Sequence, residues 1–234
     1  MGLSLENSLS FDIFLNTATL IAVLYCFWGD IKRIFVDLSS QGFSSRSKTL
    51  VYALILGTIP AGIIGLFYGN LLEETFRNSH TVAWALIAGG VLMFVADKVN
   101  RNVGMNHGGI TAVKGFVVGV FQSLALIPGV SRSGATISGG FLSKLSREEA
   151  IRFSFLLYIP ISLGALLKSI MDVSRAGETI AGGFMNLPAI LAFLFALVSG
   201  VWAVKFMVRY LSHHSFTPFI IYRVLLAIII FVFL

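Results

Sequence analysis

Residues 115–142 read GFVVGVFQSLALIPGVSRSGATISGGFL. An apolar stretch with helical character ends near Pro128 and Gly129, and a second stretch, rich in small residues, follows them. Proline removes a backbone donor and ends a helix, whereas glycine accepts unusual dihedral angles. Two half-helices around a polar break are typical of a re-entrant or broken helix pair. Such a break persists at membrane depth only inside protein or beside a wet cavity. We therefore expect the functional site at this break; the alternative is an ordinary loop between two spans.

Six apolar runs flank this segment, and each is long enough, or nearly so, to cross about 30 Å of hydrocarbon as a helix. They cover residues 11–28, 50–68, 82–96, 151–171, 187–208 and 218–234. The chain is 56% hydrophobic and 12% charged, whereas about 25% of the residues in a soluble domain are charged. These features predict an all-α integral membrane protein, with about six transmembrane helices and one re-entrant or broken pair. We expect one membrane domain over residues 1–234.

The net charge of +6 would suggest a nucleic-acid partner in a soluble protein, but the basic residues of this chain lie in short gaps between apolar runs. Gaps rich in lysine and arginine face the cytoplasm. The gaps at residues 29–49 and 98–114 are basic and are predicted to be cytoplasmic, whereas the gap at 72–81 is predicted to be external. Lys144 and Arg147 then suggest that the broken segment returns to the side it left. We expect no nucleic-acid partner.

Single residues in the runs have simpler interpretations. Cys26 is the one cysteine of the chain, which excludes an intrachain disulfide. The N-terminus lacks the pattern of a cleavable signal peptide. Gly62 and Gly65 flank small residues, and Gly89–Gly90 is predicted to permit close helix contact. Packing is the role that we favour for all four glycines.

Arg132 lies within the break, among the hydroxyl groups of Ser131, Ser133 and Thr136. An arginine between apolar half-helices is costly unless it is paired, and no carboxylate follows it in the sequence before Glu148. A guanidinium can grip phosphate with a planar fork of donors. Hydroxyl groups and the first amides of a following helix favour the same anion. The pattern therefore favours an anionic ligand at Arg132; the alternative is an arginine that caps carbonyls of a neighbouring half-helix.

Two further residues are predicted to contribute to this anion site. Gly134 would let the backbone approach the ligand closely. Gln122 lies roughly two helical turns before the break and is expected to face the same cavity. The residues themselves predict no metal site.

The run from Gly119 to Gly140, GVFQSLALIPGVSRSGATISGG, resembles the second signature of undecaprenyl-diphosphate phosphatases, the bacterial membrane enzymes also called bacitracin-resistance proteins. Residues 154–160 and 219–223 resemble later landmarks of the family, so the resemblance covers essentially the whole chain. It implies hydrolysis of undecaprenyl diphosphate to undecaprenyl phosphate, which recycles the lipid carrier of cell-wall synthesis and confers bacitracin resistance. It also implies a multi-pass protein of the bacterial plasma (inner) membrane, with a transporter-like fold of inverted repeats.

The resemblance implies that Arg132, Ser131 and Ser133 bind the diphosphate and take part in catalysis, with Thr136 beside them. It implies a divalent cation, Mg2+ or Ca2+, and a polyisoprenyl diphosphate lipid as the partner in the bilayer. A homodimer is a further partner that we consider for the chain.

The chain departs from the family pattern near its N-terminus. The family has a first signature with two glutamates, serines and a histidine, and we expect this chain to start after that signature, so that part of the first repeat is missing. Residues 16–19, NTAT, also differ from the usual family pattern. Two other functions therefore stay open: a non-catalytic protein that binds or moves a polyprenyl phosphate, and a small transporter of an unrelated anion.

Overall fold

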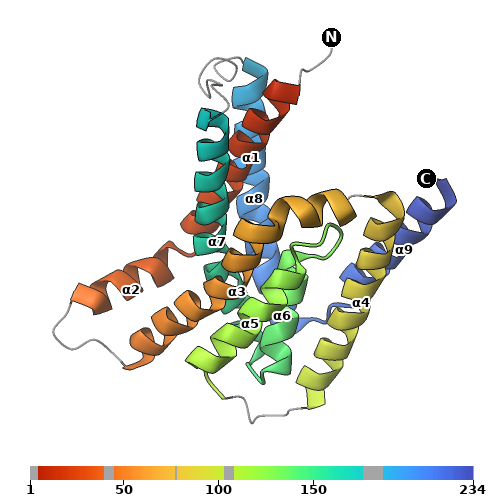
Figure 1. Ribbon diagram of the computed structural model, residues 1–234. Coiled ribbons are helices and arrows are strands. Elements are labelled where there is room, and N and C mark those ends of the chain that lie inside the picture. Colours follow the sequence, from red (N-terminus) through yellow and green to blue (C-terminus); the bar gives the residue numbers. More distant parts are fainter. Residues whose placement is uncertain (1–4, 40–44, 77, 103–107, 176–186, 234) are drawn as a thin grey trace. The chain divides into compact units, whose positions relative to one another are not determined.

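The computed structural model describes residues 5–39, 45–76, 78–102, 108–175 and 187–233 (Figure 1). Within these residues it has nine α-helices and no strand, which confirms the predicted all-α class. Four helices are long and apolar enough to cross a membrane, and a bent pair can supply a fifth span. The four helices are α3 (Ser45–Phe76), α4 (Ser79–Asn102), α7 (Arg147–Arg175) and α8 (Leu187–His213).

The other predicted runs take shorter or bent forms. The first run forms α1 (Leu5–Cys26), which bends by 68° into α2 (Trp28–Ser39). The last run forms α9 (Thr217–Phe233), which is apolar but only 17 residues long. The segment at residues 115–142 forms two short helices, α5 (Ala112–Leu124) and α6 (Arg132–Leu142), as the proline and glycine between them predict.

The chain divides into two compact units, one of which holds residues 1–35 and 158–207. In this unit α1 packs beside α8 (Figure 1), where Phe14 meets Phe193 with 4.6 Å between ring centroids. Further along both helices, the Lys205 ammonium lies 5.3 Å from the Tyr25 ring centroid. The later residue of α1 contacts the later residue of α8, so the two helices run in the same direction.

The second unit holds residues 36–157 and 208–234, and its most extensive helix contact joins α3 to α5. A Cβ atom on Gly57 would lie 2.8 Å from the carbonyl oxygen of Gly115. A Cβ atom on Gly119 would lie 2.7 Å from the Gly57 Cα atom, and one on Gly115 would lie 2.6 Å from the Ala53 Cα atom. The two backbones approach this closely because small residues recur at every fourth position on both helices.

The glycines singled out from the sequence behave differently. A Cβ atom on Gly62 would have nothing within 4 Å, and one on Gly65 would meet only the Leu126 side chain, at 3.7 Å. The packing role favoured for Gly62 therefore has no partner among the described residues. On α4, Gly90 meets Ile220 of α9, and Gly89 lies against the side chain of Arg223.

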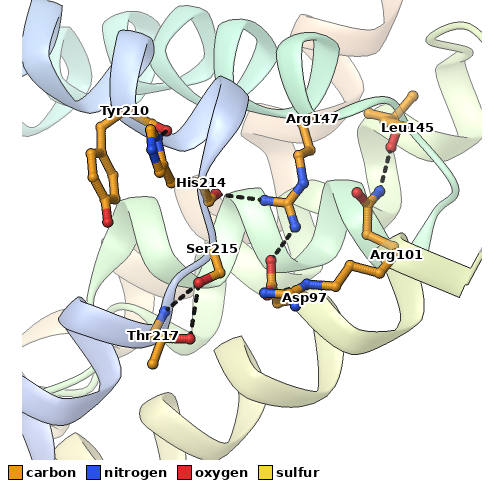
Figure 2. Close-up of polar contacts among 9 residues, drawn as sticks. Asp97, Arg101, Leu145, Arg147, Tyr210, His214, Ser215 and Thr217 are labelled. Atoms are coloured by element: carbon orange, nitrogen blue, oxygen red, sulfur yellow. Dashed lines mark hydrogen bonds and ion pairs between the residues drawn. The ribbon is translucent and has the colours of Figure 1, made fainter.

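A polar cluster joins the end of α4 to the start of α7 (Figure 2). The Asp97 carboxylate accepts from Arg147 and, at 2.8 Å, from Nη2 of Arg101. Arg147 also donates to the His214 carbonyl oxygen at 3.0 Å, and the Asn100 amide donates to the Leu145 carbonyl oxygen at 2.9 Å. The chain between α4 and α7 therefore returns to the end of α4 from which it departs, as the basic residues predict.

Candidate functional site

The break between α5 and α6 spans residues 125–131. Helix α5 ends at Leu124, earlier than the sequence predicts, because the amides of Ala125, Leu126 and Ile127 bond to carbonyls three residues back and form successive tight turns. Apolar side chains continue through these turns, so nothing in the local pattern marks the end of the helix. Gly129 has a φ of 96°, which is the unusual conformation expected after Pro128.

Ser131 caps the second half-helix. Its side-chain oxygen accepts the amide of Gly134 at 3.1 Å, and α6 begins at Arg132. The Oγ atoms of Ser131 and Ser133 lie 3.4 Å apart. Because Ser131 uses a lone pair for the cap, its hydroxyl proton remains able to donate elsewhere. The first turn of α6 thus combines two adjacent hydroxyl groups with the amide end of a helix, an arrangement suited to an anion.

Exposure distinguishes the first turn of α6 from the rest of the helix. Ser131, Arg132 and Ser133 are half-buried, whereas every residue from Gly134 to Phe141 is buried. The structure therefore brings together the three residues predicted to act on the phosphate and leaves them accessible. The remainder of α6 serves as a buried support.

Thr136 lies on that buried part of α6. Its hydroxyl donates to the carbonyl oxygens of Arg132 at 2.9 Å and Ser133 at 3.3 Å, and it contacts the hydroxyl of Ser154 on α7. With its proton directed to these carbonyls, Thr136 supports the first turn of α6 from beneath. Its role as a direct phosphate ligand stays a prediction.

Gly134 fits against α4. A Cβ atom there would lie 2.9 Å from the Met93 sulfur and 3.1 Å from the Ser131 Cβ atom. The absence of a side chain therefore allows both the close packing of α6 on α4 and the Ser131 cap. Whether Gly134 also lets a ligand approach stays a prediction.

Gln122 lies in the last turn of α5, nearer to the break than the sequence predicts, because α5 ends early. It is 2% exposed, and neither atom of its side-chain amide has a hydrogen-bond partner among the described residues. A buried amide without partners costs free energy. The described structure leaves this amide unsatisfied, and the role of Gln122 in ligand binding stays a prediction.

Candidate metal ligands lie apart among the described residues. No group of three or more His, Cys, Asp or Glu residues among them could hold an ion. Asp12, His80, His213 and His214 are exposed. The side chain of Glu6 and all of His107 lie outside the described part of the chain. The described residues therefore offer no cluster of three such donors, and the divalent cation stays a prediction.

Two residues around the break were not assigned a role from the sequence. Ser154 contacts Thr136, and Arg223 of α9 donates to the Gly129 carbonyl oxygen at 2.8 Å. A signal for Arg223 was present, since it is the one charged residue of α9, an otherwise apolar helix. The same reasoning that singled out Arg132 applies to it.

Comparison with known proteins covers nearly the whole chain. The family model described as bacitracin resistance protein BacA matches residues 1–229. An undecaprenyl-diphosphatase of Thermodesulfovibrio yellowstonii is 38% identical over 96% of this chain and 81% of its own length. Undecaprenyl-diphosphatases of Elusimicrobium minutum and Moorella thermoacetica are each 37% identical, and the alignments cover 83% of each relative. The chain therefore belongs to the bacitracin resistance protein family BacA.

Proposed function

We propose that this chain hydrolyses undecaprenyl diphosphate to undecaprenyl phosphate and inorganic phosphate in the bacterial plasma membrane. The single structural observation that carries the proposal is the accessible turn Ser131–Arg132–Ser133 at the capped start of a buried helix. Relatives named undecaprenyl-diphosphatase along most of the chain support the substrate and the reaction. The reaction recycles the lipid carrier of cell-wall synthesis, which also explains resistance to bacitracin.

The residues of the site can do the electrostatic part of this reaction. The oxygen of water bonds to the terminal phosphorus and releases a proton to solvent, while the bond from that phosphorus to the bridging oxygen breaks and leaves undecaprenyl phosphate. Negative charge is spread over the phosphoryl oxygens in the transition state. Arg132 would hold two of these oxygens with its fork of donors, and the hydroxyls of Ser131 and Ser133 would donate to the same group. Gln122 would supply its unpartnered amide to the bound diphosphate.

A divalent cation, Mg2+ or Ca2+, is the part of the proposal that rests on family resemblance. Such a cation would neutralise charge on the diphosphate. The described side chains provide no cluster for it, so no step above depends on it. Loss of hydrolysis on chelation, with recovery when either ion is added, would support this part.

The assay measures phosphate release from undecaprenyl diphosphate by the purified protein in detergent. We expect Arg132→Ala to lower kcat by about 100-fold or more, because a preorganised donor to the transition state is lost. Arg209→Ala, which removes an exposed arginine of α8, is the matched control and should leave kcat unchanged.

The outcomes separate the rival functions. Phosphate release by the wild-type protein at the blank rate would reject hydrolysis and favour a non-catalytic lipid-phosphate carrier, which no present observation favours. Normal hydrolysis by Arg132→Ala would reject the role of Arg132 alone. The homodimer and the lack of a nucleic-acid partner remain predictions, and light scattering of the detergent complex measures the first.

A further inference from the structure

Arg223 is a buried arginine within an apolar helix. It is 7% exposed, although every other residue of α9 is uncharged. No carboxylate pairs with it among the residues that the structure describes. A buried charge of this kind is costly unless its donors are satisfied.

Backbone carbonyls accept hydrogen bonds from two of its three nitrogens. Nε donates to the Leu86 carbonyl oxygen at 3.2 Å, and Nη2 donates to the carbonyl oxygens of Ala85 at 3.4 Å and Gly129 at 2.8 Å. Leu86 and Ala85 belong to α4, whereas Gly129 belongs to the break before α6. The guanidinium therefore connects three separate parts of the chain: α9, α4 and the break.

The break also lies directly against α4 at this point. A Cβ atom on Gly129 would lie 2.7 Å from the Val82 carbonyl oxygen and 3.0 Å from the Ala85 Cβ atom. Gly129 is two residues before Ser131, the cap of α6. A shift of Gly129 would therefore move the cap and the start of the phosphate-binding turn.

Helix α4 is shaped to admit the guanidinium. The three atoms nearest to a Cβ atom built on Gly89 are all from Arg223, with Cζ at 3.3 Å, Nε at 3.8 Å and Nη2 in direct overlap. An alanine at position 89 would displace the guanidinium. The neighbouring Gly90 differs, since its Cβ atom would meet only the Ile220 side chain, at an ordinary 3.7 Å.

We propose that Arg223 is a positioning residue for hydrolysis: it holds the Gly129 carbonyl against α4 and so fixes Ser131, Arg132 and Ser133 for the diphosphate. This positioning role rests on the proposed function, but it involves no contact between Arg223 and the substrate. The main rival is a purely structural connection between α9 and α4, with no effect on the geometry of the site.

The experiment compares Arg223→Ala, Arg223→Lys, Gly89→Ala, the double variant Gly89→Ala/Arg223→Ala, and Gly90→Ala as the control. Hydrolysis of undecaprenyl diphosphate gives kcat and KM, size-exclusion chromatography verifies folding, and hydrogen exchange followed by mass spectrometry reports on residues 125–134. We expect Arg223→Ala to lower kcat by about 100-fold, since misplacement by about 1 Å has that effect, and to speed exchange in the break. Arg223→Lys should recover part of kcat, because an ammonium can still donate to a carbonyl.

The double variant gives the sharpest result. Gly89→Ala alone should lower kcat, because its methyl group displaces the Arg223 guanidinium. The double variant should have the same kcat as Arg223→Ala, because no guanidinium remains for that methyl group to clash with. Gly90→Ala should match the wild type in kcat and in exchange. The proposal is overturned if the fold-losses in kcat from Gly89→Ala and Arg223→Ala multiply in the double variant. It is also overturned if Arg223→Ala folds and shows normal kcat and normal exchange in the break.

Two arms keep the test decisive. If Arg223→Ala does not fold, Arg223→Lys and Gly89→Ala answer the question: reduced kcat with faster exchange in either supports positioning, and normal values in both reject it. If the wild-type protein releases no phosphate, the proposed function fails, whereas the exchange arm still decides whether Arg223 holds the break.

Discussion

At the scale of single residues, the unusual side chains are polar groups that α5, α6 and α9 bury. Arg223 has all its recorded hydrogen bonds to carbonyls. Gln122 has none at its amide among the described residues, although it is even more deeply buried. The two residues therefore differ: the fold supplies acceptors for Nε and Nη2 of Arg223, whereas the ligand role of Gln122 stays a prediction.

Gln122→Leu should separate stability from binding. Leucine has a similar size and needs no hydrogen bond, so removal of the unsatisfied amide should leave the melting temperature in detergent unchanged or higher. The same change should raise KM for undecaprenyl diphosphate by about 10-fold, the equivalent of one lost hydrogen bond of roughly 1.4 kcal/mol. A lower melting temperature with unchanged KM would show that Gln122 belongs to the packing and not to the ligand site.

At the scale of elements, the crossing of α3 and α5 depends on small residues. Gly119→Ala places a Cβ atom against the backbone of Gly57, and a backbone cannot move aside as a flexible side chain can. We expect a loss of about 1–3 kcal/mol in the free energy of unfolding, which is typical of overpacking. Titration with sodium dodecyl sulfate, followed by circular dichroism, measures it.

Gly62→Ala is the matched control on α3, because a Cβ atom there meets nothing within 4 Å. It should cause no loss of stability, since alanine favours the helix over glycine. Equal losses for the two variants would mean that the crossing does not decide the effect at Gly119, because helix propensity alone predicts a gain from alanine.

The cluster around Asp97 joins elements that are distant in sequence (Figure 2). The Asp97 side chain is 8% exposed and pairs with Arg147 and Arg101, whose side chains are 20% and 57% exposed. Asp97→Asn keeps the shape but removes the charge, and we expect a loss of about 1.5–3 kcal/mol in the free energy of unfolding. Arg101→Ala should change it by less than about 0.5 kcal/mol, because its pair is mostly exposed. The reverse order in the same unfolding titration would assign the stabilisation to Arg101.

At the scale of the whole molecule, the apolar surface and the basic gaps determine how the chain sits in a bilayer. Large apolar side chains remain exposed along all four long helices, where lipid can cover them. The link between Asp97 and Arg147 places the end of α4 and the start of α7 together. The basic residues around both ends predict that this side is cytoplasmic.

Cysteine labelling tests this orientation in a Cys26→Ala background, which leaves no native thiol. Three exposed positions are suitable: Glu74 near the end of α3, Lys98 in the last turns of α4 and Glu148 at the start of α7. A membrane-impermeant maleimide added to intact cells should label Glu74→Cys. The same reagent should label Lys98→Cys and Glu148→Cys only in inverted vesicles. Labelling of Lys98→Cys and Glu148→Cys from opposite sides would mean that residues 103–146 cross the membrane and do not return.

The sequence by itself determined the membrane class, the two half-helices and the cluster Ser131, Arg132 and Ser133. These features depend on hydropathy, on Pro128 and Gly129, and on a few adjacent polar residues. Each of these features depends on residues close together in the sequence, because proline limits the backbone locally and a hydroxyl caps a helix that starts one residue later.

Only the tertiary structure decided where α5 ends, which glycines pack, and what supports the site. Arg223 reaches a carbonyl 94 residues away, and Thr136 meets Ser154 on another helix. Gly62 and Gly119 look alike in the sequence, yet one faces open space and the other faces a backbone. These contacts depend on which helix faces lie together in three dimensions, and the local hydropathy pattern does not specify that pairing.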